Sequence, residues 1–259
     1  THNGVDTHFI HFHLYDVQVI NRVGWDGMIK PPDVNEVAWK DTVRMNPLED
    51  IIVALRPMKQ TLPFELPNSI RPMDVTHSIG VSNPDNTPGF ANVDPGNNPA
   101  TVNNDVINYG WEYVVHCHIL GHEENDMMRA QMMAVPPDPV TNVTAVRQGA
   151  GNAQRVLVTW TDGSINETGF TVQRSTTPNG PWLSLTPSSP PAPGRGTVMT
   201  FIDTTIARRT TYYYQVVANN VVGYTQTYAA PAIGYPTLSA DSVPVAAPAP
   251  VTILANNEP

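Results

Sequence analysis

The chain has 259 residues, a formal net charge of −9 and an estimated pI near 5.2. That acidity argues against nucleic acid or an anionic membrane surface as a partner. No stretch reaches the roughly 20 apolar residues that span a bilayer, and a single cysteine excludes an internal disulfide. The length allows two ordinary domains, and sparse charge with plentiful Pro, Thr, Asn and Val favours extracellular β structure.

The first half of the chain predicts short strands separated by loops rich in turn residues. Gly27 and the Pro31-Pro32 pair place a loop over residues 24–36. A long insert rich in Pro, Asn and Gly covers about residues 57–108. Apolar alternation predicts strands over residues 8–23, 37–44, 48–55, 113–115 and 129–135, with Met133 and Val135 facing inward.

Two histidine-rich motifs carry the chemistry: His8 to His13 with three imidazoles, and His116 to Met127 with three imidazoles, the only thiol and a thioether. Neighbouring side chains on a strand point to opposite faces, so Cys117 faces away from its two histidine neighbours. By the same parity His8 lies opposite to His11 and His13 and is available to Cys117. Two His, one Cys and a weak axial Met form the blue-copper set, so one strand end serves two metal sites.

Together these motifs resemble the C-terminal cupredoxin domain of multicopper oxidases, most closely the bacterial laccase and bilirubin-oxidase types. The resemblance covers about residues 5–135 and includes Trp39-Lys40-Asp41-Thr42-Val43. It implies a Greek-key β-barrel or sandwich over residues 1–136, N-terminally truncated. The copper ligands that it implies are His8, Cys117 and His122 with axial Met127 for type 1, His11 for type 2, and His13, His116 and His118 for the type 3 pair.

Glu123 matches a carboxylate that the family uses to deliver protons, although a solvated acid beside the ligands is the alternative. Met128 adjoins Met127, so the axial assignment depends on spacing alone, and Phe9 stands where the family usually has Pro. His77 is expected to be an ordinary loop residue, and the terminal His2 is uninformative.

The implied activity couples one-electron oxidation of a phenol, a pigment or a metal ion at type 1 copper to four-electron reduction of dioxygen to water. The trinuclear copper cluster needs four more imidazoles, which an N-terminal cupredoxin domain of the same protein or of another subunit would supply. The chain therefore resembles the downstream half of a secreted or cell-surface bacterial oxidase. Two alternatives remain: a non-catalytic blue-copper electron-transfer or copper-binding protein with an adhesive domain, and a copper nitrite reductase.

The prolines at 136, 137 and 139 mark a boundary. With segments such as Val156-Leu157-Val158-Thr159-Trp160 and Gly180-Pro181-Trp182, residues 138–232 resemble a fibronectin type III domain. Alternation places Val156, Val158 and Trp160 on one core face, and Tyr212, Tyr214, Val216 and Ala218 on another. Tyr212 is expected to be the corner tyrosine that bonds back to the backbone. A carbohydrate-binding platform at Trp182 is the alternative function. Residues 233–259 are expected to form a Pro/Ala-rich tail or linker, and the fold class is all-β throughout.

Overall fold

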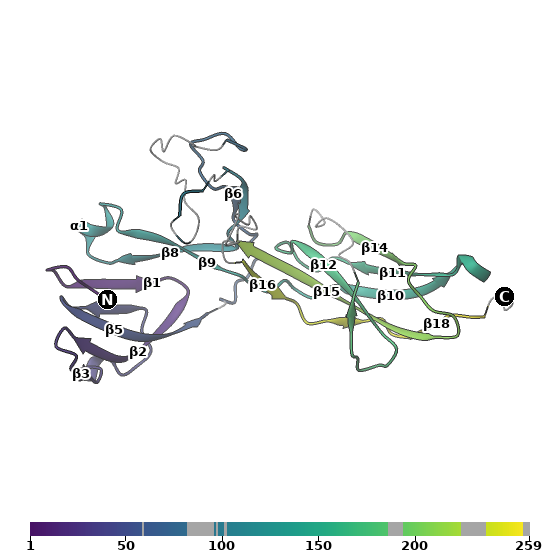
Figure 1. Cartoon of the computed structure of the whole chain (residues 1–259), viewed down its shortest axis with the longest axis horizontal. Coiled ribbons are helices and arrows are strands. Elements are labelled where there is room, and N and C mark those ends of the chain that lie inside the picture. Colours follow the sequence, from purple (N-terminus) through teal and green to yellow (C-terminus); the bar gives the residue numbers. More distant parts are fainter. Residues whose placement is uncertain are drawn as a thin grey trace. The chain divides into compact units, whose positions relative to one another are not determined.

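The computed structural model describes residues 1–58, 60–81, 96, 98–100, 103–185, 194–223 and 237–255. The chain is all-β, as predicted, and every paired strand in the described part is antiparallel. It divides into two compact units (Figure 1). Unit 1 comprises Thr1–Phe64 and Glu112–Met133, and unit 2 comprises Glu65–Trp111 and Ala134–Pro259.

Unit 1 contains two sheets, of four and three strands. The first has the order β4-β1-β8-β9, and its strands are Thr42–Met45, His8–Phe12, Trp111–Cys117 and Met128–Met133. The second has the order β3-β2-β5, and its strands are Ile29–Lys30, Tyr15–Gly24 and Glu49–Pro57. The buried core of unit 1 consists of Val17, Val19 and Val43. Val17 and Val19 are alternate residues of β2, as expected for a strand with one buried face.

An irregularity in β2 changes which side chains face inward. Its pairing with β5 shifts register between Val19 and Asn21, which leaves one residue extra on β2. Such a bulge reverses the alternation beyond it, so Arg22 is 3% exposed while Ile20 is 48% exposed. The sequence pattern did not predict this inward arginine.

The segment expected to be a loop over residues 24–36 has more structure than predicted. It contains β3 and a 3-10 turn, η1, over Val34–Glu36. Asp33 and Glu36 form a reciprocal capping box at the start of that turn. The cap and the pairing of β3 with β2 order a segment that glycine and proline alone would leave irregular.

Unit 2 is built around a two-sheet sandwich. One sheet has the order β10-β11-β14, with strands Thr141–Gln148, Arg155–Thr161 and Val198–Asp203. The other centres on β15, Thr211–Gly223, which pairs with β12, Gly169–Ser175, and β12 pairs in turn with β13, Leu183–Ser184. A short 3-10 turn, η2 at Gly151–Ala153, connects β10 to β11.

The sandwich core confirms the predicted alternation. Trp160 is completely buried beside Phe170, with ring centroids 5.5 Å apart, and Tyr214 is 1% exposed. The Tyr212 hydroxyl accepts a hydrogen bond of 2.9 Å from the Ala207 backbone N–H, as expected for a corner tyrosine. The core side chains are Val140, Val143, Val156, Val158, Trp160, Phe170, Val172, Tyr212, Tyr214, Val216, Ala218, Val251 and Ile253.

The insert expected within the first domain belongs instead to unit 2 over residues 65–111. Its strands β6, Ile70–Pro72, and β7, Val106–Asn108, pair with each other, and β7 reaches β15 through Asn108 opposite Gly223. Asn220 is fully buried and exchanges hydrogen bonds with Asn68 at 3.1 and 3.2 Å. Long-range amide pairing of this kind leaves no periodic signal in the sequence.

The expected tail over 233–259 is also structured where the chain is described. Three strands there pair with β15: β16 at Thr237–Asp241, β17 at Val245–Ala246 and β18 at Val251–Thr252. The predicted boundary at 232/233 lies outside the described residues. The prediction of a tail or linker is therefore wrong for these three strands, because their backbones pair with β15.

Among the described residues, no helix has the length and apolar character that crossing a bilayer requires. The α-helix α1 spans only Leu120–Glu123.

Candidate metal centres

Strand register brings the two histidine motifs together. β1 and β8 pair antiparallel with Ile10 opposite Cys117 and His11 opposite His116. Because faces alternate, His8 shares the face of Ile10 and Cys117, and His13 shares the face of His11. This register therefore divides the side chains of the two motifs between two faces.

His8, Cys117 and His122, here called the thiol group, converge on one face. Cys117 Sγ lies 3.4 Å from His122 Nδ1, which lies 3.2 Å from His8 Nδ1. Ligands that bind a metal tetrahedrally at about 2 Å are separated by about 3.3 Å, so these separations suit a shared ion. The thiol is completely buried, whereas both imidazoles are only partly buried.

His11, His13 and His116, here called the imidazole group, lie on the other face. The three residues offer nitrogen atoms within 4.8 Å of one another. The His13 and His116 Nε2 atoms are 3.3 Å apart. His118 is exposed and flanks the group, with its ring centroid 5.3 Å from that of His116 and 5.4 Å from that of His11.

Hydrogen bonds on the far side of the rings select which nitrogen is available. His11 Nδ1 lies 3.0 Å from the Asp41 carbonyl oxygen and 3.1 Å from Thr42 Oγ1, so it carries the proton and leaves Nε2 as the donor to a metal. His116 Nδ1 lies 3.2 Å from the Cys117 carbonyl oxygen, with the same consequence. The two groups thus present different nitrogens: Nδ1 in the thiol group and Nε2 in the imidazole group.

Burial, together with neighbouring imidazoles, lowers the pKa of two of these histidines, His8 and His13. Burial lowers the pKa of His8, and the charges of His2 and His122 lower it further. Burial also lowers the pKa of His13, with contributions from His11 and His116. Neutral imidazoles have the free lone pair that a metal requires, so the side chains are suited to bind at neutral pH.

Glu123, in α1, lies beside the imidazole group. Its Oε2 is 3.8 Å from His116 Nδ1, and its side chain is 35% exposed. The carboxylate can therefore contact both solvent and His116.

Met127 approaches the thiol group through its backbone. Its carbonyl oxygen accepts from the Cys117 N–H at 3.3 Å, and its own N–H donates to the His122 carbonyl oxygen at 3.0 Å. The Met127 side chain is 42% exposed. The axial role of its thioether stays a prediction.

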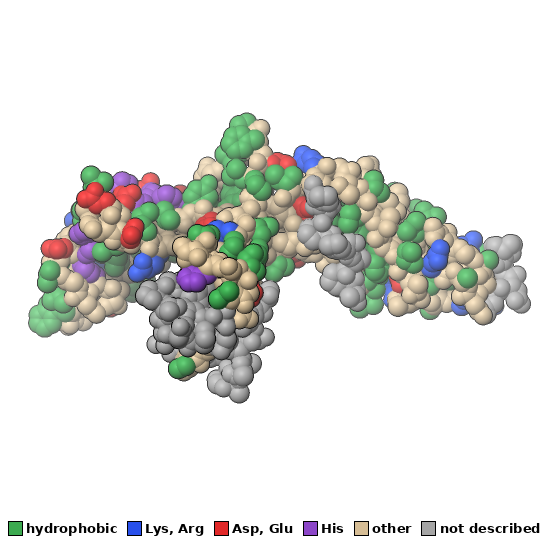
Figure 2. Space-filling view, turned by 90° about the horizontal axis from the view of Figure 1, so that it is seen from above, with side chains coloured by type: hydrophobic (Ala, Val, Ile, Leu, Met, Phe, Trp, Pro, Cys, Tyr) green, Lys and Arg blue, Asp and Glu red, His purple; other side chains and the backbone are tan. Residues whose placement is uncertain are grey.

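Three neighbours of the ligands were not predicted. His2 packs edge-on against His8, with ring centroids 4.7 Å apart, although its position in the sequence gives no signal. Asp41 and Thr42, which orient His11, belong to the Trp39–Val43 stretch. The sequence predicted no role at the site for either residue. Figure 2 shows histidine side chains at the surface of unit 1 with acidic side chains beside them.

His77 belongs to unit 2 and is a member of neither group. Its Nδ1 is 2.9 Å from Asp74 Oδ2, and the Asp74 carboxylate also accepts from the Thr76 backbone N–H at 2.8 Å. Because these contacts close a local turn, they agree with the predicted role as a loop residue.

Comparisons with known proteins add little about function. No protein-family model matches the chain, and no curated protein matches it. Among solved structures, the chain is similar to an Fn3-like protein from Clostridium thermocellum, at 23% identity over 44% of this chain and 93% of that chain, with a TM-score of 0.27. A likeness this low carries no functional argument, so the function has to be argued from the two groups themselves.

Proposed function

We propose that this chain is the C-terminal part of a multicopper oxidase, in which unit 1 is a cupredoxin domain holding a type 1 copper and half of a trinuclear copper cluster. The observation that carries the proposal is the pair of ligand groups on opposite faces of one strand pair. A thiol with two imidazole Nδ1 atoms suits type 1 copper, and a set of imidazole Nε2 atoms suits the cluster. Copper bound there would supply one-electron redox chemistry and dioxygen reduction.

The chain's own part in this function begins with Cys117. Burial excludes water from its sulfur, which suits a thiolate ligand, while the partly buried His8 and His122 lie nearer to solvent. A reducing substrate such as a phenol, a pigment or a metal ion would therefore approach the thiol group from the side of His8 and His122. Cys117 is bonded through the backbone to His116 and His118, so the two groups are connected by a few covalent bonds.

Glu123 is placed to hold or pass a proton near the imidazole group. Its carboxylate lies beside His116 Nδ1 and is partly open to solvent. A carboxylate in that position can take a proton from water and release it toward the imidazole group. Reduction of dioxygen to water would consume such protons.

This part of the site is incomplete on its own. The imidazole group has three members close together, with His118 beside them, whereas the cluster of the proposed family uses eight imidazoles. We expect an N-terminal cupredoxin domain, in the same protein or in another subunit, to supply the other four. The sandwich would space or anchor the oxidase, and a secreted or cell-surface location would suit it.

Copper analysis of the His13→Ala variant tests the proposal against a simple electron shuttle. After Cu(II) loading, the wild-type chain is expected to hold blue copper and additional copper without thiolate absorption. The variant should keep the blue copper and lose most of the additional copper, because His13 belongs only to the imidazole group. His77→Ala is the matched control and should change neither.

Equal copper content in His13→Ala and wild type would favour the non-catalytic electron-transfer alternative. Dioxygen uptake adds a second readout. The isolated chain should show none, and sustained uptake by the chain alone would contradict the half-site argument.

A further inference from the structure

Unit 1 contains a pocket that shares no residue with either metal group. Its volume is about 320 Å³, at the lower end of the roughly 300–1,000 Å³ typical of small-molecule sites. The end of β2, strand β3 and the turn between β4 and β5 enclose it. Nothing in the proposed oxidase chemistry uses these residues.

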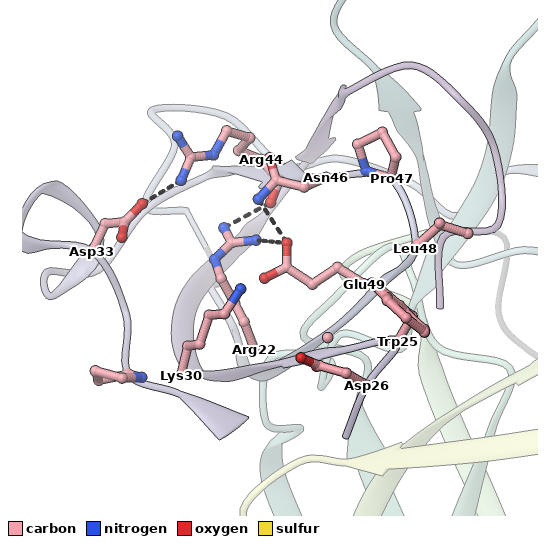
Figure 3. A pocket seen from close by; sticks show the side chains of 12 residues that line it. Arg22, Trp25, Asp26, Lys30, Asp33, Arg44, Asn46, Pro47, Leu48 and Glu49 are labelled. Carbon is pink, nitrogen blue, oxygen red and sulfur yellow. Dashed lines mark hydrogen bonds and ion pairs between the residues drawn. The ribbon is translucent and has the colours of Figure 1, made fainter. Parts of the chain in front are cut away.

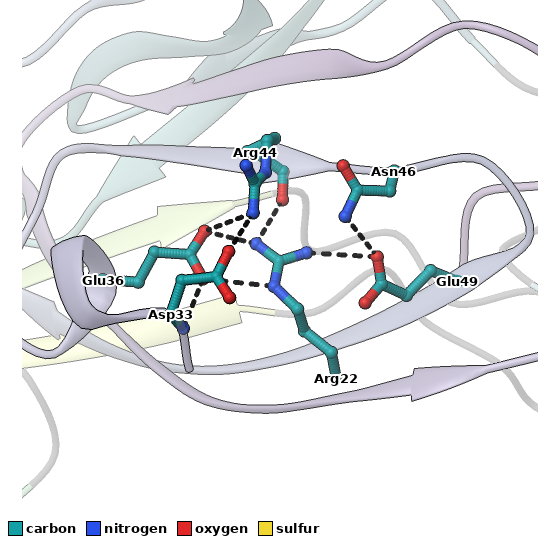
Figure 4. Close-up of polar contacts among 6 residues, drawn as sticks. All are labelled: Arg22, Asp33, Glu36, Arg44, Asn46 and Glu49. Carbon is teal, nitrogen blue, oxygen red and sulfur yellow. Dashed lines mark hydrogen bonds and ion pairs between the residues drawn. The ribbon is translucent and has the colours of Figure 1, made fainter. Parts of the chain in front are cut away.

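The base of the pocket is fixed by a buried arginine. The Arg22 guanidinium donates through Nε to Glu36 Oε2 at 3.2 Å and through Nη1 to Glu49 Oε2 at 3.3 Å (Figure 4). It also donates through Nη2 to the Arg44 carbonyl oxygen at 2.8 Å. Because Asn46 Nδ2 donates to the same Glu49 oxygen at 2.6 Å, that carboxylate is held in one orientation.

Two charged groups remain free to meet a ligand. Figure 3 shows the side chains of Lys30 and Glu49 entering the pocket from opposite walls. Within the described part of the chain, neither the Lys30 ammonium nor Glu49 Oε1 has a hydrogen-bond partner. A donor and an acceptor therefore face the same space, and the bonds from Arg22 and Asn46 hold the carboxylate that carries the acceptor.

The charged side chains that line the pocket are equal in number for each sign, and Glu36, paired with Arg22 and Arg44, lies outside the lining. Its charged lining side chains are three cations and three carboxylates: Arg22, Lys30, Arg44, Asp26, Asp33 and Glu49. Either an anion or a cation entering this space would meet as many like charges as opposite ones. A neutral ligand with several hydroxyl groups can form hydrogen bonds with both the cations and the carboxylates, because each hydroxyl donates and accepts.

An aromatic side chain completes the lining. Trp25 follows β2 directly, lines the pocket and is 83% exposed, and Leu48, on another wall, is 54% exposed. An indole this exposed contributes little to the core of unit 1, yet it offers a flat apolar surface beside fixed polar groups.

From these observations we infer that the pocket binds a neutral saccharide, with a sugar ring stacked on Trp25 and its hydroxyls bonded to Lys30 and Glu49. The apolar face of a pyranose fits an aromatic ring, and its edge of hydroxyls fits the paired donor and acceptor. The site would attach unit 1 to a glycan independently of copper. It differs from the platform predicted at Trp182, which is in unit 2.

Calorimetric titration of the full chain tests this inference. The neutral probes are glucose, galactose, mannose, xylose, N-acetylglucosamine and cellobiose, and the charged comparators are glucuronate and glucosamine. At least one neutral sugar should bind with a millimolar or lower Kd, and the charged comparators should bind more weakly. Trp25→Ala should weaken that binding about tenfold, and Lys30→Ala should weaken it at least threefold.

Trp39→Ala is the matched control, since Trp39 is a half-exposed tryptophan of the same unit that stacks under Arg56 and does not line the pocket. Its affinity should stay within twofold of wild type. The inference is overturned if no neutral sugar binds, if Trp25→Ala binds as well as wild type, or if a charged comparator binds more tightly than every neutral sugar. Circular dichroism of each variant confirms that its fold is retained.

Discussion

Two carboxyl groups buried together in unit 2 give a quantitative prediction about stability. Asp162 is 1% exposed and Glu167 is 7% exposed. Asp162 Oδ1 accepts from the Ser164 backbone N–H at 3.1 Å, but Oδ2 is buried without a partner in the described structure. Glu167 Oε2 accepts from Ser164 Oγ at 2.6 Å. Burial, with the adjacent Glu167 charge, raises the pKa of Asp162 from 3.8 to about 6.

The sign of the pH dependence follows from that direction. Between about pH 4 and pH 6 the folded chain keeps a proton on Asp162 that the unfolded chain has released. This group therefore stabilises the fold most at low pH, and its contribution is lost as the pH rises through about 6. The full change in pKa corresponds to about 3 kcal/mol, and solvent screening reduces it to about 1–2 kcal/mol.

Asp162→Asn is expected to stabilise unit 2 by about 1–2 kcal/mol at pH 7. The amide oxygen of the variant keeps the hydrogen bond from the Ser164 N–H. The uncharged amide no longer repels the Glu167 carboxylate. Urea unfolding followed by fluorescence measures the change, because Trp160 is completely buried in the core of this unit. The difference from wild type should be near zero at pH 4 and reach a plateau above pH 7.

Asp241→Asn is the control, because Asp241 is an exposed carboxylate of the same unit that accepts hydrogen bonds from Asn219 and Ser239. It should change stability by less than about 0.5 kcal/mol. A destabilised Asp162→Asn variant at pH 7, or a gain that is the same at pH 4 and pH 7, would refute the argument from a buried, protonated carboxyl.

The remaining stability predictions concern buried polar networks. Arg22→Met leaves the buried Glu49 carboxylate without a cation and leaves Glu36 only Arg44, 3.8 Å away, so unit 1 should lose about 3–5 kcal/mol in chemical denaturation; a loss below about 1 kcal/mol would contradict the buried ion pairs. Asn220→Ala removes the donor to the Val135 carbonyl oxygen and the contacts with Asn68, and it should destabilise unit 2 by about 2–3 kcal/mol. Unchanged urea unfolding of Asn220→Ala would show that this network does not hold residues 65–111 on the sandwich.

Local alternation made part of the candidate site predictable. The parity of His8, His11 and His13 on one strand, and of Cys117 between two histidines on another, fixes which side chains can meet. The antiparallel pairing of β1 with β8 then places them on two faces. The sandwich core was predictable for the same reason, since Trp160 and its neighbours alternate without interruption.

Features that depend on non-local pairing were not predictable. The bulge in β2 reverses the alternation and brings Arg22 inward. No residue pattern in β2 predicts the bulge. Asn108 and Asn220 tie the insert to unit 2 across more than a hundred residues of sequence. His2 contacts His8, and its backbone is held by a bridge to Glu49, far away in the sequence.

The proposed function requires that Cys117 and two imidazoles hold one copper ion. Visible absorption during Cu(II) titration of the full chain, beside Cys117→Ser and His11→Ala, tests it most directly. Wild type and His11→Ala should both develop the intense blue band of a Cu(II)–thiolate bond at one equivalent, since His11 belongs to the other face. Cys117→Ser should stay colourless. A wild-type chain that binds copper without this band, or a band that depends on His11 as much as on Cys117, would contradict the two-face arrangement.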